Sequence, residues 1–265
     1  MSELAAVAGA VAWTGRLTAL ALALQTLELL GVRRAWSDTG IWRWALLAPE
    51  HQALPAPLRW LLAQLLPERR FAALLWLRLL AALALGVGVG PGMAPFLLLT
   101  QVAIGVRFRG TFNGGSDSFS VVLLCALSLA ELLPERAPVQ RAALLYIAVQ
   151  LTLAYFVSGV AKLKHPEWRS GLALAGFLRS GRYGTPRALL RALDGPVRIS
   201  ALSMLVLGFE CAFPLAWSGP GACGAFIALG LGFHLATWLL FGLNRFVFVW
   251  AAAYPALWWC CQWVG

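Results

Sequence analysis

The sequence predicts an all-α fold: a polytopic transmembrane helix bundle of about eight spans, with further amphipathic helices in the membrane interface. Of the 265 residues, 60% are hydrophobic and only 12% are charged, whereas ordinary soluble domains carry about 25% charged residues. Apolar runs of about 20 residues, the length that crosses a bilayer as a helix, recur along the chain. We therefore expect one integral membrane domain over residues 1–265, in contact with the lipid bilayer.

Eight apolar segments have the composition of spanning helices, although the third is short. In chain order they cover residues 8–31, 71–89, 92–106, 118–133, 142–163, 198–217, 221–241 and 244–263. Prolines, which break helices, lie in the gaps between segments, in the order Pro67, Pro91, Pro134, Pro166 and Pro220. These breaks favour separate helices over longer continuous ones.

Two long connections are rich in Trp, Arg and Leu. Residues 41–66 read "IWRWALLAPEHQALPAPLRWLLAQLL", and residues 164–197 contain "WRSGLALAGFLRSGRYGTPRALLRAL". Arg and Trp are the residues that favour headgroup depth, and the Leu spacing is amphipathic. We expect both connections to form helices that lie in the membrane interface.

The distribution of Lys and Arg predicts the orientation in the membrane. Seventeen of them lie in or beside the connections 32–70, 107–117, 163–197 and 242–245, against two on the opposite side. Basic loops favour the cytoplasmic side, so we expect cytoplasmic basic loops and both termini outside, in a bacterial inner membrane. Since these residues flank apolar segments, the net charge of +10 does not indicate a nucleic-acid partner.

Of the charged residues within the predicted spans, where a charge costs about 2.5–3.5 kcal/mol on insertion scales, four are candidates for ion pairs with one another. They are Arg16, Glu28, Arg78 and Glu210. We expect intramembrane ion pairs in which Arg16 and Arg78 bind Glu28 or Glu210. A protonated Glu210 that donates a hydrogen bond is the alternative for that residue, because desolvation favours the neutral carboxyl group.

Lys162 lies near the end of the fifth segment and has two interpretations. Its apolar stem can cover the membrane surface while the amine reaches the headgroups. Alternatively it faces inward, because Tyr155, Ser158, Gly159 and Lys162 fall on one helical face whose small residues allow close approach. Desolvation on that face would disfavour the ammonium and favour a neutral amine that acts as a base.

The stretch "RFRGTFNGGSDSF" (107–119) precedes the fourth segment. A turn at residues 113–115 with Ser116 or Asp117 as helix cap is one interpretation, and binding of a polar headgroup by Asn113 and Asp117 is the other. His234 lies in the middle of the seventh segment, where a lone histidine often bonds a neighbouring helix. The five cysteines and three histidines have no metal-site spacing, so we expect no metal.

Two motifs stand out in the second half of the chain: "YFVSGVAKLKHPEWRSG" (155–171) and "FHLATWLLFGLNRFVFVWAAAYP" (233–255). Both resemble segments of vitamin K-dependent gamma-glutamyl carboxylases and of the HTTM (horizontally transferred transmembrane) domain that these share with many bacterial proteins. The two motifs occur in the family's order and at comparable separation, and the likeness spans roughly residues 107–258. The chain departs from the carboxylases in lacking a histidine after the Asn113 region.

The resemblance implies a quinone or hydroquinone pocket, menaquinone-like, among the later helices. Lys162 would be the base that deprotonates the hydroquinone, and His234 a second catalytic residue. Residues expected to bind the quinone or substrate are Asn113, Asp117, Tyr155, Ser158 and Trp168. The reaction implied is quinol-dependent oxygenation or carboxylation, a lyase chemistry, on a peptide or lipid. Because Lys162 lies on the basic side, the site would open toward the cytoplasm.

Two other functions remain open. The first is a non-catalytic subunit that binds quinone or lipid and assembles with a larger membrane complex, which is favoured by the missing histidine and by the missing extramembrane region that follows the bundle in the carboxylases. A small quinone-oxidoreductase subunit of the DoxX type also carries a Gly-x-x-Lys-Leu helix, although the motif around His234 argues against it.

Overall fold

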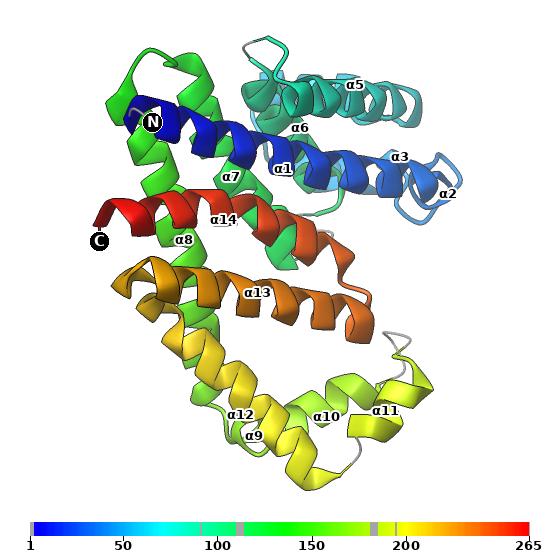
Figure 1. The fold of residues 1–265 in the computed structure, drawn as a ribbon. Coiled ribbons are helices and arrows are strands. Elements are labelled where there is room, and N and C mark those ends of the chain that lie inside the picture. Colours follow the sequence, from blue (N-terminus) through cyan, green and yellow to red (C-terminus); the bar gives the residue numbers. More distant parts are fainter. Residues whose placement is uncertain (1–2, 91, 110–113, 181–184, 194, 265) are drawn as a thin grey trace. The chain divides into compact units, whose positions relative to one another are not determined.

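All regular secondary structure in the described part of the chain is helical. The computed structural model describes residues 3–90, 92–109, 114–180, 185–193 and 195–264, which form fourteen α-helices and two short 3-10 helices without a strand (Figure 1). The predicted all-α fold class is therefore confirmed.

Six helices within the described residues are long and apolar enough to cross a membrane, which indicates an integral membrane protein. They are α1 (Glu3–Gly31), α5 (Glu68–Val87), α7 (Gly114–Leu132), α8 (Ala137–Leu163), α12 (Pro196–Ala212, extended by the 3-10 helix η2, Phe213–Ser218) and α13 (Pro220–Phe241). Each coincides with a predicted span to within a few residues.

The other two predicted spans form helices that differ from these six. α6 (Met93–Arg107) has 15 residues and is about 22 Å long, which is shorter than the roughly 30 Å hydrocarbon core. α14 (Asn244–Val264) has 21 residues, but its sequence includes several tryptophans and Pro255, which make it less apolar than the six.

The two Trp- and Arg-rich connections fold into short helices. The first contains α3 (Trp44–Leu47), η1 (Ala48–His51) and α4 (Ala56–Leu65), and is preceded by α2 (Arg33–Trp36). The second contains α9 (Pro166–Arg169), α10 (Leu172–Arg179) and α11 (Arg187–Leu193). Their helical structure agrees with the sequence, and their interfacial depth stays a prediction.

The chain divides into two compact units. Unit 1 comprises Met1–Ala10 and Leu144–Gly265, and unit 2 comprises Val11–Ala143. Each unit is described by itself below. The expectation of a single domain over residues 1–265 stays a prediction.

Unit 2 has a core between α1, α5, α6 and α7. Its fully apolar part includes Leu22, Ala82, Leu97 and Leu124, all nearly inaccessible. Because alanines occupy several of these positions, the helices can approach closely. α6 and α7 are adjacent in the sequence and also pack against each other.

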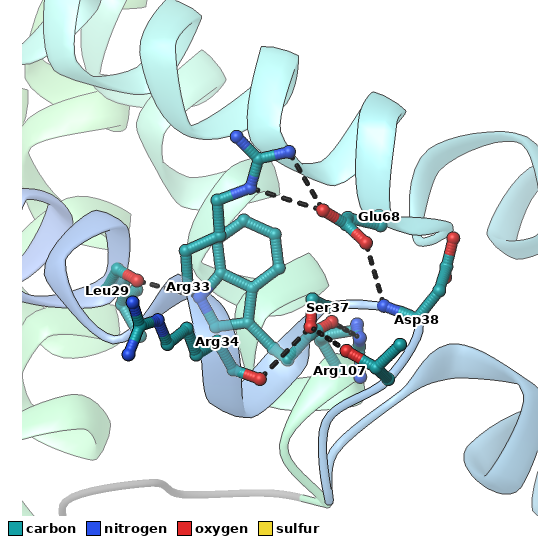
Figure 2. Close-up of polar contacts among 9 residues, drawn as sticks. Leu29, Arg33, Arg34, Ser37, Asp38, Glu68 and Arg107 are labelled. Carbon is teal, nitrogen blue, oxygen red and sulfur yellow. Dashed lines mark hydrogen bonds and ion pairs between the residues drawn. The ribbon is translucent and has the colours of Figure 1, made fainter.

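The segment after α1 is fixed to α5 and α6 by polar contacts (Figure 2). Arg33 forms an ion pair with Glu68 at 2.8 Å, and the other Glu68 oxygen accepts the Asp38 amide at 2.7 Å. The buried guanidinium of Arg107 donates to the carbonyl of Trp36 at 2.8 Å and to that of Trp42. These bonds give partners to the Asp38 amide and to the carbonyls of Trp36 and Trp42, which lack a hydrogen bond within a helix.

Unit 1 is built from most of α8 together with α12, η2, α13 and α14. α13 and α14 pack against each other along their lengths. Gly242, with φ 68°, ends α13 in the left-handed conformation, which glycine adopts without steric cost. The turn therefore brings α14 back beside α13.

Candidate functional site

Unit 1 contains an apolar cavity of about 520 Å³. α10, α12 and α13 supply most of its lining, which includes Leu174, Phe177, Phe209, Leu229, Phe233 and Leu240. Lys162, at the end of α8, is the one charged side chain among the described residues that line it, and Trp168 of α9 lies beside it. The volume is within the range of about 300–1,000 Å³ typical of small-molecule sites.

The ammonium of Lys162 forms a closed set of polar contacts. It donates to Ser158 Oγ at 2.9 Å and to the two carboxylate oxygens of Glu210 at 2.5 and 2.6 Å. An ammonium has three N–H donors, so all three have acceptors within the protein. The side chain of Lys162 is 22% exposed and that of Glu210 only 3%, so the lysine lies between the carboxylate and the cavity.

Trp168 completes the polar end of the cavity. The Lys162 Nζ atom lies 5.4 Å from the centroid of its ring, a distance at which a cation is attracted to the aromatic face. The indole and the ammonium therefore form one wall with both apolar and charged character.

Gly159 allows α8 and α12 to approach closely beneath this pair. A Cβ atom at position 159 would lie 2.8 Å from the Cys211 amide nitrogen and 2.8 Å from Glu210 Cβ. Both distances are shorter than van der Waals contact, and neither the backbone nitrogen nor the Cβ atom can move away without a shift of α12. Because Gly159 lies about one helical turn before Lys162 on α8, this close approach brings the Glu210 carboxylate within reach of the Lys162 ammonium.

We expect Gly159→Ala to separate α8 from α12 and lower the melting temperature in detergent by several degrees. Overpacking costs roughly 1–3 kcal/mol. The matched control is Gly208→Ala on α12, where an added Cβ meets no atom within 4 Å. Equal destabilisation by the two substitutions would contradict the close-contact argument.

A buried chain of three side chains lies behind the cavity wall. Tyr155 Oη on α8 is 2.8 Å from His234 Nε2 on α13 and 2.8 Å from Tyr254 Oη on α14. The ring of Tyr155 contacts Phe209 and Phe233, whose side chains line the cavity. Tyr155 and His234 are therefore second-layer residues that support the wall, and neither lines the cavity itself.

The contacts of the His234 ring indicate which of its two nitrogens carries the proton. Its Nδ1 atom is buried and has no hydrogen-bond partner among the described residues. A buried N–H without a partner costs more than an unused lone pair, so we place the proton on Nε2, which donates to Tyr155. The Tyr155 hydroxyl proton is then available for the hydrogen bond with Tyr254.

The sequence indicated Lys162, Ser158 and Trp168 as site residues, but it did not indicate that Glu210 is the partner of Lys162. Glu210 was expected to bind Arg16 or Arg78, whereas it pairs with Lys162. Fourteen residues of α12, about 21 Å, precede Glu210, so the spacing along the chain gave no sign of this contact. Tyr254 was also missed, because a tyrosine in an apolar run has no distinguishing sequence signal.

Arg78 and Asp117 belong to a separate buried network in unit 2. The Arg78 guanidinium donates from its five N–H groups to Thr26 Oγ1, the Leu97 carbonyl, Thr100 Oγ1, Gln25 Oε1 and Gln101 Oε1, over 2.6–3.1 Å. Gln25 in turn donates to Asp117 Oδ1 at 2.8 Å. A guanidinium has five donors, so the protein itself satisfies Arg78, and the network joins α1, α5, α6 and α7.

The start of α7 differs from the prediction. The helix begins at Gly114, so Ser116 and Asp117 lie in its first turn and are not helix caps. Asn113 lies outside the described residues. The two glycines that predicted a turn are accommodated in the helix, where the buried Asp117 side chain binds Gln25.

The remaining charged residues of α1 do not pair with each other. Arg16 and Glu28 are twelve residues apart on this helix, about 18 Å along its axis, which is too far for the expected ion pair. Arg16 is exposed, and its guanidinium carbon lies 5.2 Å from the centroid of the Trp13 ring.

We expect Arg78→Lys to destabilise the protein by about 2 kcal/mol or more, because three ammonium donors cannot satisfy five buried acceptor contacts. Arg34→Lys, at an exposed position of α2, is the control and should leave stability unchanged. Thermal unfolding in bicelles measures both. A wild-type transition for Arg78→Lys would show that the network contributes little.

Neither a metal site nor a comparison with known proteins assigns a function to this cavity. Within the described ranges, no group of three or more His, Cys, Asp or Glu residues has an arrangement that could hold a metal ion. No family profile, no curated protein and no solved structure matches the chain. The functional interpretation therefore depends on the residues of the site and on the two motifs.

Proposed function

We propose that this protein binds a quinone or hydroquinone in the unit 1 cavity, as a vitamin K-dependent gamma-carboxylase-like (HTTM) membrane protein. The observation that supports this most directly is the Lys162–Glu210 pair at the edge of an otherwise apolar cavity. A quinone combines a small polar ring with a long apolar tail, and a cavity with one polar end matches that distribution.

The lining residues fit such a ligand in size and chemistry. Once Lys162 has passed a proton to Glu210, its amine can accept a hydrogen bond from a ring hydroxyl, and the Trp168 indole offers a face for stacking against the ring. Leu229, Phe233 and Leu240 provide an apolar path for an isoprenoid tail. Because the polar groups are few, they would set the orientation of the ring while burial of apolar surface supplies most of the affinity.

The pair also has the parts for proton transfer. Lys162 can pass a proton to Glu210, and both groups are then neutral, a state that a low dielectric favours. The neutral amine facing the cavity is then able to accept a proton, which is the role that the resemblance implies for Lys162. In an oxygenation, a bound hydroquinone would supply electrons for the reduction of dioxygen, and a carboxylation would also require carbon dioxide as co-substrate.

A non-catalytic membrane subunit that binds quinone or lipid is the second candidate. It is favoured by the closed contacts of Lys162, whose three N–H donors are all used within the protein. In this role the pair would orient a ligand without taking up its proton, and the protein would assemble with a larger membrane complex or a peptide partner.

We further propose that all eight apolar helices cross the bilayer, with both termini outside and the basic loops in the cytoplasm of a bacterial cell. α14 supports this because its 21 residues extend about 31 Å, enough to span the hydrocarbon core. α6 would span only with local thinning or with help from its neighbours. α3, α4, α10 and α11 would lie in the interface.

The binding proposal predicts that the double variant Lys162→Met/Glu210→Gln binds a short-chain menaquinone analogue at least about tenfold more weakly than wild type. Removing both charges together leaves no unpaired buried charge, and a charge-assisted hydrogen bond contributes about 1.5–3 kcal/mol. Equilibrium titration in nanodiscs measures the affinity. Lys164→Met, an exposed neighbour, is the control, and wild-type affinity in the double variant would refute the proposal.

Oxygen uptake separates the two candidates. If the protein is catalytic, wild type with the reduced analogue consumes oxygen, and Lys162→Met abolishes the uptake while Lys164→Met does not. A protein that binds the analogue normally but consumes no oxygen is the non-catalytic subunit.

A further inference from the structure

A second, smaller crevice in unit 1 combines arginines with an apolar floor. It has a volume of about 200 Å³ and lies between α10, α11 and the first turn of α12. Its lining consists of Leu178, Arg179, Leu190, Arg191, Leu193 and Ile199. Leu178 and Ile199 are buried, and Arg191 is exposed, so the charge is at the rim and the apolar surface is inside.

The surrounding sequence has a strong excess of positive charge. Residues 162–198 contain eight Lys or Arg residues against two acidic ones, Glu167 and Asp194. Such clusters next to membrane segments attract anionic lipid surfaces. Guanidinium groups in particular match the geometry of phosphate oxygens and can bind them with two parallel hydrogen bonds.

Exposed apolar side chains of the same elements indicate that this surface meets lipid. Leu172 on α10 is 68% exposed, and Val197 at the start of α12 is 80% exposed. In water both would expose apolar area at a cost, whereas in the interface they contact acyl chains. The apolar floor of the crevice would likewise gain from an acyl chain and would gain nothing from a soluble anion.

We propose that this crevice is a binding site for one anionic phospholipid, with its phosphate between Arg179 and Arg191 and the upper part of an acyl chain on Leu178, Leu190 and Ile199. This site is separate from the quinone cavity, and it does not depend on the proposed function. Since α10 supplies Leu174 and Phe177 to the cavity and Leu178 and Arg179 to the crevice, the lipid would hold the helix that closes one side of the cavity.

The test is competition between lipids on the full-length protein. Delipidated protein in detergent receives equal amounts of phosphatidylglycerol and phosphatidylcholine, and native mass spectrometry counts the lipids retained. Wild type is expected to retain the anionic lipid about tenfold over the zwitterionic one. Arg191→Gln is expected to reduce this preference about fivefold, the contribution of one basic residue near an anionic surface.

Three controls make the outcome specific. Arg34→Gln removes an exposed basic residue of unit 2 and should leave the preference unchanged. Leu190→Asn keeps the charge of the crevice but makes its floor polar, and should also weaken retention of phosphatidylglycerol. Inorganic phosphate in large excess should not displace the lipid.

The proposal is overturned by equal retention of the two lipids, or by an equal effect of Arg34→Gln and Arg191→Gln, which would show only diffuse attraction. If inorganic phosphate displaced the lipid and Leu190→Asn had no effect on lipid retention, the crevice would be a site for free phosphate, and the proposal would be overturned. Because Arg191 is exposed, Arg191→Gln is expected to fold normally, and its thermal transition verifies this.

Discussion

The candidate site of unit 1 depends on one ion pair at the edge of an apolar cavity, between Lys162 and Glu210. A carboxylate that is almost fully buried loses its hydration, and that loss is offset only when the partner is close and the remaining contacts are satisfied. Two short contacts to the ammonium and a third from Ser158 meet this requirement. They are possible because Gly159 has no side chain to separate α8 from α12.

Unit 2 contains a buried charge with a different arrangement. Arg78 of α5 is surrounded by neutral acceptors from α1 and α6, which take up all five of its donors. Lys162 also has all its donors occupied, yet its amine lines a cavity on one side. Lys162 differs from Arg78 in that its amine contributes directly to the lining of a cavity large enough for a small molecule.

The sequence predicted the helices well because the properties of a span are local. Its composition and prolines indicated 221–241 and 244–263, and the structure has helices over Pro220–Phe241 and Asn244–Val264. Helical periodicity also grouped Tyr155, Ser158, Gly159 and Lys162, all of which contact α12, α13 or α14.

Contacts between segments that are distant in the sequence could not be predicted from local sequence properties. The pairing of Lys162 with Glu210 depends on where α12 begins relative to the end of α8, which α9, α10 and α11 determine. No local sequence pattern predicts this position. Gln25, Thr100 and Gln101 were overlooked because neutral polar residues are tolerated in spans, although they supply most of the acceptors of Arg78. The sequence thus indicated which charges lie in the membrane but not which groups surround them.

The most direct measurement of the central claim is a high-resolution cryo-electron microscopy map of the protein purified in native lipid. We expect a flat, ring-shaped density within hydrogen-bonding distance of Lys162 Nζ and against Trp168, continuing as a tail between α12 and α13. A cavity filled by rearranged side chains, or a Lys162 amine that points to the headgroups and leaves Glu210 without its partner, would contradict the account.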